Sequence, residues 1–181
     1  SVKNKLEHDW VAALIRSELF TGTQTLLSEQ MLAYRKGYGE YSNVHTSLFI
    51  NETILARKFF RDRLEKYIYR LTEEIISSLK RNIPVGFSGE DTISKVRAVF
   101  DSYEFRTRFI EDVEIRKAFN FGKVTGLKDS GSESFYIYSE LGECEFGERL
   151  KDKEINLKNI SLEDVPPFHA KCSYTVVKNL P

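Results

Sequence analysis

The sequence predicts an α+β protein that is mainly helical, with long N-terminal helices followed by a small C-terminal β element that contains two knuckle-like turns. Apolar residues recur at helical spacing as far as about residue 127, and beyond Gly131 apolar and polar residues alternate instead. The 181 residues are 41% hydrophobic and 13% aromatic, which is enough to bury a core. We expect two regions: residues 1–82 with one long helix, and residues 83–181 with two helices and the small sheet.

The charge composition restricts the partners. The chain has 27 basic and 27 acidic residues, whereas a dedicated nucleic-acid-binding protein usually has a strong basic excess. No apolar run reaches the length that crosses a membrane, so we predict no membrane partner. Two cysteines in the whole chain fit a reducing cytoplasm. A disulfide between Cys144 and Cys172 is the alternative in an oxidising compartment.

The first 44 residues are predicted to contain helices with interruptions. Residues 3–18 have an amphipathic helical pattern, residues 20–23 (Phe-Thr-Gly-Thr) form a break, and residues 26–32 form a short helix. Residues 36–41 are rich in glycine and tyrosine and are predicted to be a loop. This loop is either a connection whose glycines adopt positive φ or a contact surface made of tyrosines.

The longest predicted element is a helix over residues 47–80, a stretch with no proline or glycine. At 1.5 Å per residue such a helix spans about 50 Å, which exceeds the diameter of a small domain. We therefore expect part of it to pack on another chain, so that the protein forms an oligomer through this helix.

A turn over residues 82–87 follows, and Ser88 is predicted to cap a short helix of three turns. After residues 101–103 a second, arginine-rich helical pattern begins. Either Gly126 or Gly131 is predicted to end it, because glycine commonly follows the last turn of a helix.

Several residues of the arginine-rich helix invite a functional interpretation. The carboxylates Glu111, Asp112 and Glu114 are predicted to form ion pairs with residues three or four positions away, so no catalytic residue is assigned. Gly122 costs about 1 kcal/mol relative to alanine inside a helix, so we expect another backbone or a bulky ring to pack against it. Asn120 is predicted to bond a neighbouring loop.

The alternating pattern beyond Gly131 predicts a small sheet. Residues 135–138 form its first strand, residues 149–157 a second strand or a loop, and residues 173–177 a terminal strand. One turn with Cys144 follows the first strand, and a second turn with His169 and Cys172 precedes the last.

Cys144, His169 and Cys172 are candidate zinc ligands, because a two-knuckle site takes its ligands from two tight turns. Gly147 stands where a C-x-x-C motif has its second cysteine, and Tyr174 stands where a final cysteine would complete the other turn. Two interpretations are open. Either zinc binds with a fourth ligand from Glu143, Glu145, Glu148, a water or a partner chain, or packing has replaced the metal and Tyr174 fills its space. We predict the metal-free protein without a cofactor, with zinc as the alternative.

The order of these motifs over residues 84–181 resembles the phage minor head protein family, also called head morphogenesis or Mu F-type proteins. The family pattern is an arginine-rich helix ending in T-E…R-A-Y-N-x-G, a strand, a C-x-x-C turn and a P-P-x-H-P-N-C-R-C-T terminus. The matching residues are Glu114, Arg116, Ala118, Asn120, Gly122, Cys144, Pro166, Pro167, His169 and Cys172. The sequence departs from the pattern at Val113, Gly147, Ala170, Lys171 and Tyr174.

The resemblance implies a structural protein of the virion and no enzyme. Such a protein is expected in few copies in the capsid interior near the portal vertex, and in the host cytoplasm during assembly. It is expected to act with portal and capsid proteins in head assembly, DNA packaging or ejection, with packaged DNA as a further partner. Residues 1–80 are similar to the C-terminal half of a portal subunit, so a portal fragment fused to a minor head domain is an alternative. A zinc-ribbon-like DNA-contacting protein is another.

Overall fold

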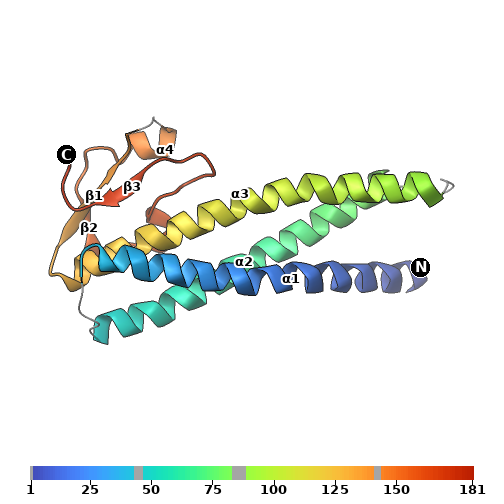
Figure 1. The fold of residues 1–181 in the computed structure, drawn as a ribbon, viewed down its shortest axis with the longest axis horizontal. Coiled ribbons are helices and arrows are strands. Elements are labelled where there is room, and N and C mark those ends of the chain that lie inside the picture. Colours follow the sequence, from blue (N-terminus) through green and yellow to red (C-terminus); the bar gives the residue numbers. More distant parts are fainter. Residues whose placement is uncertain (1, 43–46, 83–88, 141–143) are drawn as a thin grey trace. The chain divides into compact units, whose positions relative to one another are not determined.

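The computed structural model describes residues 2–42, 47–82, 89–140 and 144–181. Three long helices come first: α1 (Val2–Gly39), α2 (Ser47–Asn82) and α3 (Gly89–Asp129) (Figure 1). The C-terminal part contains the strands β1 (Ser134–Tyr138), β2 (Ile155–Asn156) and β3 (Thr175–Val177), the short helix α4 (Glu145–Glu148) and the 3-10 helices η1 (Leu157–Asn159) and η2 (Leu162–Asp164). The predicted α+β, mainly helical class is confirmed. None of the described helices has a stretch that is long and apolar enough to cross a membrane.

The predicted break at residues 20–23 is wrong, because α1 continues through it, and α1 also includes residues 36–39 of the predicted loop. In the predicted break, the hydroxyl groups of Thr21 and Thr23 donate to the carbonyl oxygens of Ser17 and Phe20, at 3.2 and 2.7 Å, and so bond within the helix. The cost of one glycine in a helix, about 1 kcal/mol, is small beside the packing that a long helix gains.

Residues 36–39 of the glycine- and tyrosine-rich stretch are the last turn of α1, and residues 40 and 41 form the turn that follows. Neither glycine of the stretch has a positive φ. Tyr34 and Tyr38 are buried core residues. The Tyr38 ring lies 4.2 Å from the Phe49 ring, measured between centroids, and the Tyr34 ring lies 5.7 Å from that of Phe121. Gly37 lacks a side chain because a Cβ there would lie closer than 3.0 Å to the backbone of Phe119. The glycine thus serves close helix contact, and the tyrosines fill the core.

The other two helices differ in how well the sequence predicts them. The long helix expected over residues 47–80 is confirmed as α2. The two helices expected between Ser88 and Gly131 are instead the single helix α3, in which Ser102 donates its hydroxyl hydrogen to the Val99 carbonyl oxygen at 2.7 Å. Serine often interrupts helices because its hydroxyl group competes for backbone hydrogen bonds. Here the Ser102 hydroxyl group is bonded within the helix, which therefore continues. Asn82, the first residue of the predicted turn, is the last residue of α2. The rest of that turn, residues 83–87, and the predicted cap Ser88 lie outside the described residues.

Gly131 ends α3, as one of the two predicted alternatives. Its φ is +80°, in the left-handed region that glycine adopts at little cost. The Ser132 N–H donates to the Leu127 carbonyl at 2.9 Å and the Gly131 N–H donates to the Lys128 carbonyl at 3.1 Å. This pair of bonds is a Schellman motif, which satisfies the last carbonyls of the helix.

The sheet has the order β2-β1-β3, with both pairs antiparallel. In its registers Phe135 lies opposite Ile155, and Ile137 lies opposite Val176. The side chains of Phe135, Ile137 and Val176 are fully buried, which confirms the predicted alternation. The predicted second strand is only the two residues of β2.

The contacts of the chain divide it into two compact units. The first consists of Ser1–Thr25 and Arg61–Phe109, and the second of Leu26–Phe60 and Ile110–Pro181. Each long helix therefore contributes to both units. The boundary at residues 82 and 83 that the sequence suggested stays a prediction. The first unit has an aliphatic core formed by Ala12, Ile15, Ile75, Ile76 and Val99.

Candidate metal centre and the clasp that positions it

The structure brings Cys144, His169 and Cys172 together, although the two cysteines are 28 positions apart in the sequence. The ligand atoms of these three residues all lie within 4.8 Å of one another. Cys144 immediately precedes α4, and the other two residues lie in the turn between η2 and β3. Cys172 is buried, whereas Cys144 and His169 are partly exposed.

Hydrogen bonds shape both turns. The Gly147 N–H donates to Cys144 Sγ at 3.2 Å, and the Glu148 N–H donates to the Cys144 carbonyl at 2.9 Å. In the second turn the Cys172 N–H donates to the His169 carbonyl at 3.1 Å. Such bonds orient the ligand atoms before an ion binds. Hydrogen bonds around the ligands of a metal site usually have this role.

Three of the four positions of a tetrahedral zinc site fit these residues. With Zn–S bonds of about 2.3 Å and Zn–N bonds of about 2.0 Å, tetrahedral ligand atoms lie about 3.5–3.8 Å apart. The observed limit of 4.8 Å is close to this spacing. Two thiols and one imidazole are also ligands that zinc prefers. Cys144, His169 and Cys172 would hold the ion between the two turns and so link them.

The fourth position has no ready ligand among the described residues. Glu145 pairs with Arg149, with 2.8 Å between Oε1 and Nη2. Glu148 accepts a hydrogen bond of 2.9 Å from the Tyr174 hydroxyl. The third glutamate considered as a ligand, Glu143, lies outside the described residues.

Gly147 and Tyr174, the two positions where the sequence lacks an expected cysteine, contact each other. A Cβ built on Gly147 would lie closer than 3.0 Å to three atoms of the Tyr174 ring. Tyr174 is 4% exposed, and its hydroxyl reaches Glu148. The ring thus takes the space that a side chain at position 147 needs. The glycine at position 147 and the tyrosine at position 174 therefore depend on each other, because the ring packs only where position 147 has no side chain.

The zinc content of the protein tests the predicted metal-free state. Protein purified without a chelator is expected to contain much less than one zinc ion per chain, because the packed Tyr174 ring leaves three protein ligands. Inductively coupled plasma mass spectrometry measures this content. One equivalent of zinc that survives gel filtration would contradict the prediction and favour a site completed by water or a partner chain.

One face of α3 holds the chain segment that carries His169 and Cys172. The Arg116 guanidinium donates to the carbonyls of Cys172 and Ala170, at 2.5 and 2.8 Å. The Lys117 ammonium donates to the Val165 carbonyl at 2.8 Å. We call this arrangement the C-terminal clasp: Arg116, Lys117, Asn120 and Lys123 of α3, with the segment 165–176 that they hold. Figure 1 shows the strands of this part beside the C-terminal half of α3.

Asn120 is the centre of the clasp. Its Nδ2 donates to the Pro166 carbonyl at 3.1 Å, and its Oδ1 accepts from the Val176 N–H at 3.0 Å and from the Thr175 hydroxyl at 2.7 Å. The side chain is 4% exposed. Lys123 adds a bond of 3.2 Å to the Val176 carbonyl. The predicted bond between Asn120 and a neighbouring loop is confirmed.

Asn120→Ala is expected to destabilise the protein by about 2–4 kcal/mol, because it leaves a buried N–H and a buried carbonyl without partners. Asn156→Ala is the matched control, since Asn156 is exposed and accepts only the local Lys158 N–H. The control is expected to change stability by less than about 1 kcal/mol. Urea unfolding followed by circular dichroism measures both. Equal midpoints for the two variants would show that Asn120 does not hold the segment.

Other residues of the family pattern are also buried within the second unit. Ala118 is fully buried, and Gly122 faces Tyr34 so closely that a Cβ would lie nearer than 3.0 Å to its carbonyl. The expected packing of another backbone on Gly122 is confirmed. Pro166 and Pro167 are buried, are joined by a cis peptide bond, and offer their carbonyls to the clasp.

The ion pairs predicted for the three carboxylates of α3 are present only in part. Asp112 pairs with Arg116, four residues on, at 2.8 Å. Glu114 is instead fully buried and accepts a hydrogen bond of 3.4 Å from Gln30. Glu111 forms no ion pair with another described residue. The helical period alone did not distinguish Glu114, because Glu111 and Lys117, three residues away on either side, are charged.

Sequence reasoning missed Lys117 and Lys123 as buried residues of the clasp. They are 3% and 8% exposed. The available signal was their spacing, because Arg116, Asn120 and Lys123 recur at intervals of four and three and so share one helix face. Lysine is rarely buried without partners, and here backbone carbonyls supply them.

Comparison of the chain with models of protein families, with curated proteins and with solved structures gave no match.

Proposed function

We propose that the protein is a structural component of a phage head, of the minor head or head morphogenesis type. It acts with portal and capsid proteins in head assembly, DNA packaging or ejection, and it acts through protein–protein contacts rather than catalysis. It resides in the capsid interior near the portal vertex, after assembly in the host cytoplasm. A portal fragment, residues 1–80, fused to a minor head domain is the alternative to this proposal.

The C-terminal clasp is the observation that carries this proposal. The residues on which the resemblance to the family depends are far apart in the sequence, and several of them have structural roles in the second unit. Arg116 and Asn120 hold the segment that contains the two prolines and Cys172. Gly122, two residues further along α3, permits close contact with α1. Each of these residues has a role in the fold, as expected of a pattern kept for architecture.

The geometry of the clasp also supports a role without catalysis. Its cationic groups Arg116 and Lys117 donate to backbone carbonyls of the chain itself, and Asn120 has both of its polar atoms bonded internally. These groups are therefore occupied in holding the fold. A reaction would need an acid or a base that can reach a substrate.

Particle composition tests the proposal. Phage particles induced from the source organism can be separated on a density gradient, and peptides of this chain quantified by mass spectrometry against the major capsid protein. We expect the chain in DNA-filled heads at a few copies per particle. Its absence from heads and from procapsids would contradict the proposal. Salt-dependent binding of the purified chain to duplex DNA would instead favour the DNA-contacting alternative.

A further inference from the structure

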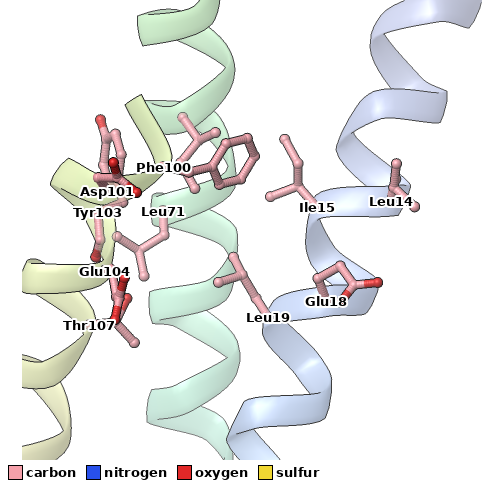
Figure 2. A pocket seen from close by; sticks show the side chains of 11 residues that line it. Leu14, Ile15, Glu18, Leu19, Leu71, Phe100, Asp101, Tyr103, Glu104 and Thr107 are labelled. Atoms are coloured by element: carbon pink, nitrogen blue, oxygen red, sulfur yellow. The ribbon is translucent and has the colours of Figure 1, made fainter. Parts of the chain in front are cut away.

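The first compact unit contains an apolar groove between three helices (Figure 2). Its volume is about 430 Å³. Figure 2 shows Ile15 and Leu19 of α1 pointing toward Phe100 of α3 and Leu71 of α2. At the edge, Leu14 is 52% exposed and Phe100 is 43% exposed. The groove therefore presents large apolar side chains to the surroundings, next to the aliphatic core of this unit.

The charged residues that line this groove are all acidic. They are Glu18, Asp101 and Glu104, and no lysine or arginine is among the described residues that line it. Glu104 pairs with Arg108 at 2.6 Å, whereas Glu18 and Asp101 form no ion pair with another described residue. Apolar walls with carboxylates at the edge favour a ligand that is apolar and positively charged. We call this site the acidic groove.

A helix face of this kind is present on the chain itself. Ile50, Ile54 and Leu55 of α2 are 55%, 64% and 59% exposed. Arg57 and Lys58 follow after the buried Ala56, are exposed, and form no ion pair with another described residue. Positions 50, 54, 57 and 58 share one side of a helix, because position 54 is four residues from positions 50 and 58 and three from position 57. We call this surface the basic face.

We propose that the basic face of one copy of the chain binds the acidic groove of a second copy. Leu71, which lines the groove, lies on α2 as well, and a continuous helix cannot fold its residues 50–58 back onto itself. The basic face must therefore come from another molecule. The contact joins two different surfaces, so a pair of copies keeps one free groove on one copy and one free face on the other. Such heterologous contacts extend to closed rings or to filaments.

This inference does not rest on the proposed function, because self-association and presence in phage particles are measured separately. Sedimentation velocity at increasing protein concentration is expected to show assemblies larger than a dimer. Ile54→Asp is expected to weaken association about tenfold or more, because it places a carboxylate against an acidic, apolar groove. Leu32→Asp is the matched control, since Leu32 is 55% exposed and belongs to neither surface. The control is expected to associate like the unchanged chain.

Two further samples test the pairing of the surfaces. An equimolar mixture of Ile54→Asp and Phe100→Asp chains has one intact face and one intact groove, so it is expected to stop at a 1:1 dimer. Arg57→Glu with Lys58→Glu is expected to prevent association, and adding Glu18→Lys with Asp101→Lys in the same chain is expected to restore it. Circular dichroism checks that each variant is folded. A chain that stays monomeric up to about 100 µM, or equal association of the Ile54→Asp and Leu32→Asp chains, overturns the proposal.

Discussion

Gly122→Ala is expected to destabilise the protein by about 3 kcal/mol, although alanine is the better helix former. The added Cβ would lie closer than 3.0 Å to the carbonyl carbon and oxygen of Tyr34 and to the amide nitrogen of Tyr38. These are backbone atoms of a long helix and cannot rotate away as a side chain can. Either α1 and α3 separate, which opens the aromatic core between them, or the helices distort.

Gly39→Ala is the matched control for this variant. Gly39 also lies in a helix of the second unit, and a Cβ there meets no atom within 4 Å. Alanine at this position is expected to leave stability unchanged or to raise it by up to about 1 kcal/mol. Chemical unfolding followed by circular dichroism compares the two. Equal stability of both variants would mean that the close contact of α1 and α3 is absent in solution.

Gly147→Cys combined with Tyr174→Cys is expected to raise the affinity for zinc by on the order of a hundredfold. The double change adds two soft ligands next to Cys144, His169 and Cys172, and it removes the ring that fills the space beside position 147. A titration against a chromophoric zinc chelator measures the affinity. The added zinc is also expected to raise the melting temperature, because metal bound only to the folded state stabilises it.

The single changes and a serine control separate packing from coordination. Gly147→Cys alone is expected to be destabilising, by about 2–3 kcal/mol, because its Cβ overlaps the Tyr174 ring. The same change is expected to cost far less when position 174 is already cysteine, which makes the two effects non-additive. Gly147→Ser with Tyr174→Ser provides similar volumes without thiols. If this serine variant bound zinc as tightly as the double cysteine variant, the added thiols would not be zinc ligands.

The helices were predictable from the sequence where the evidence is local. α2 has an uninterrupted apolar period and no glycine or proline, so its bounds followed closely. The end of α1 was wrongly predicted near Gly37. This glycine is required by the close backbone of Phe119, which is 82 residues away in the sequence. A glycine in a helix signals close contact only when the partner is known. At Gly122 the same logic was applied and proved correct.

The candidate site was predictable from chemistry more than from pattern. Two thiols and an imidazole in two turns suggested one place in the fold, and the structure brings them together. The contact between Gly147 and Tyr174 could not be read from the sequence, because neither residue type implies the other. Lys117 was missed for a different reason: its carbonyl partner at Val165 is 48 residues away, and a charged side chain usually indicates solvent.

The C-terminal clasp has a consequence for how this sequence can change over evolutionary time. Arg116, Lys117 and Lys123 hold the segment through its main-chain carbonyls, which every amino acid supplies. Position 170 can therefore accept many residues while its carbonyl still receives the Arg116 hydrogen bond. Selection for these hydrogen bonds therefore acts on the donor side chains of α3. It acts much less on the residue types of the segment that supplies the carbonyls. Divergence should accumulate first at positions 170 and 171, and relatives with this fold should be recognised by the spacing of Arg116, Asn120 and Gly122.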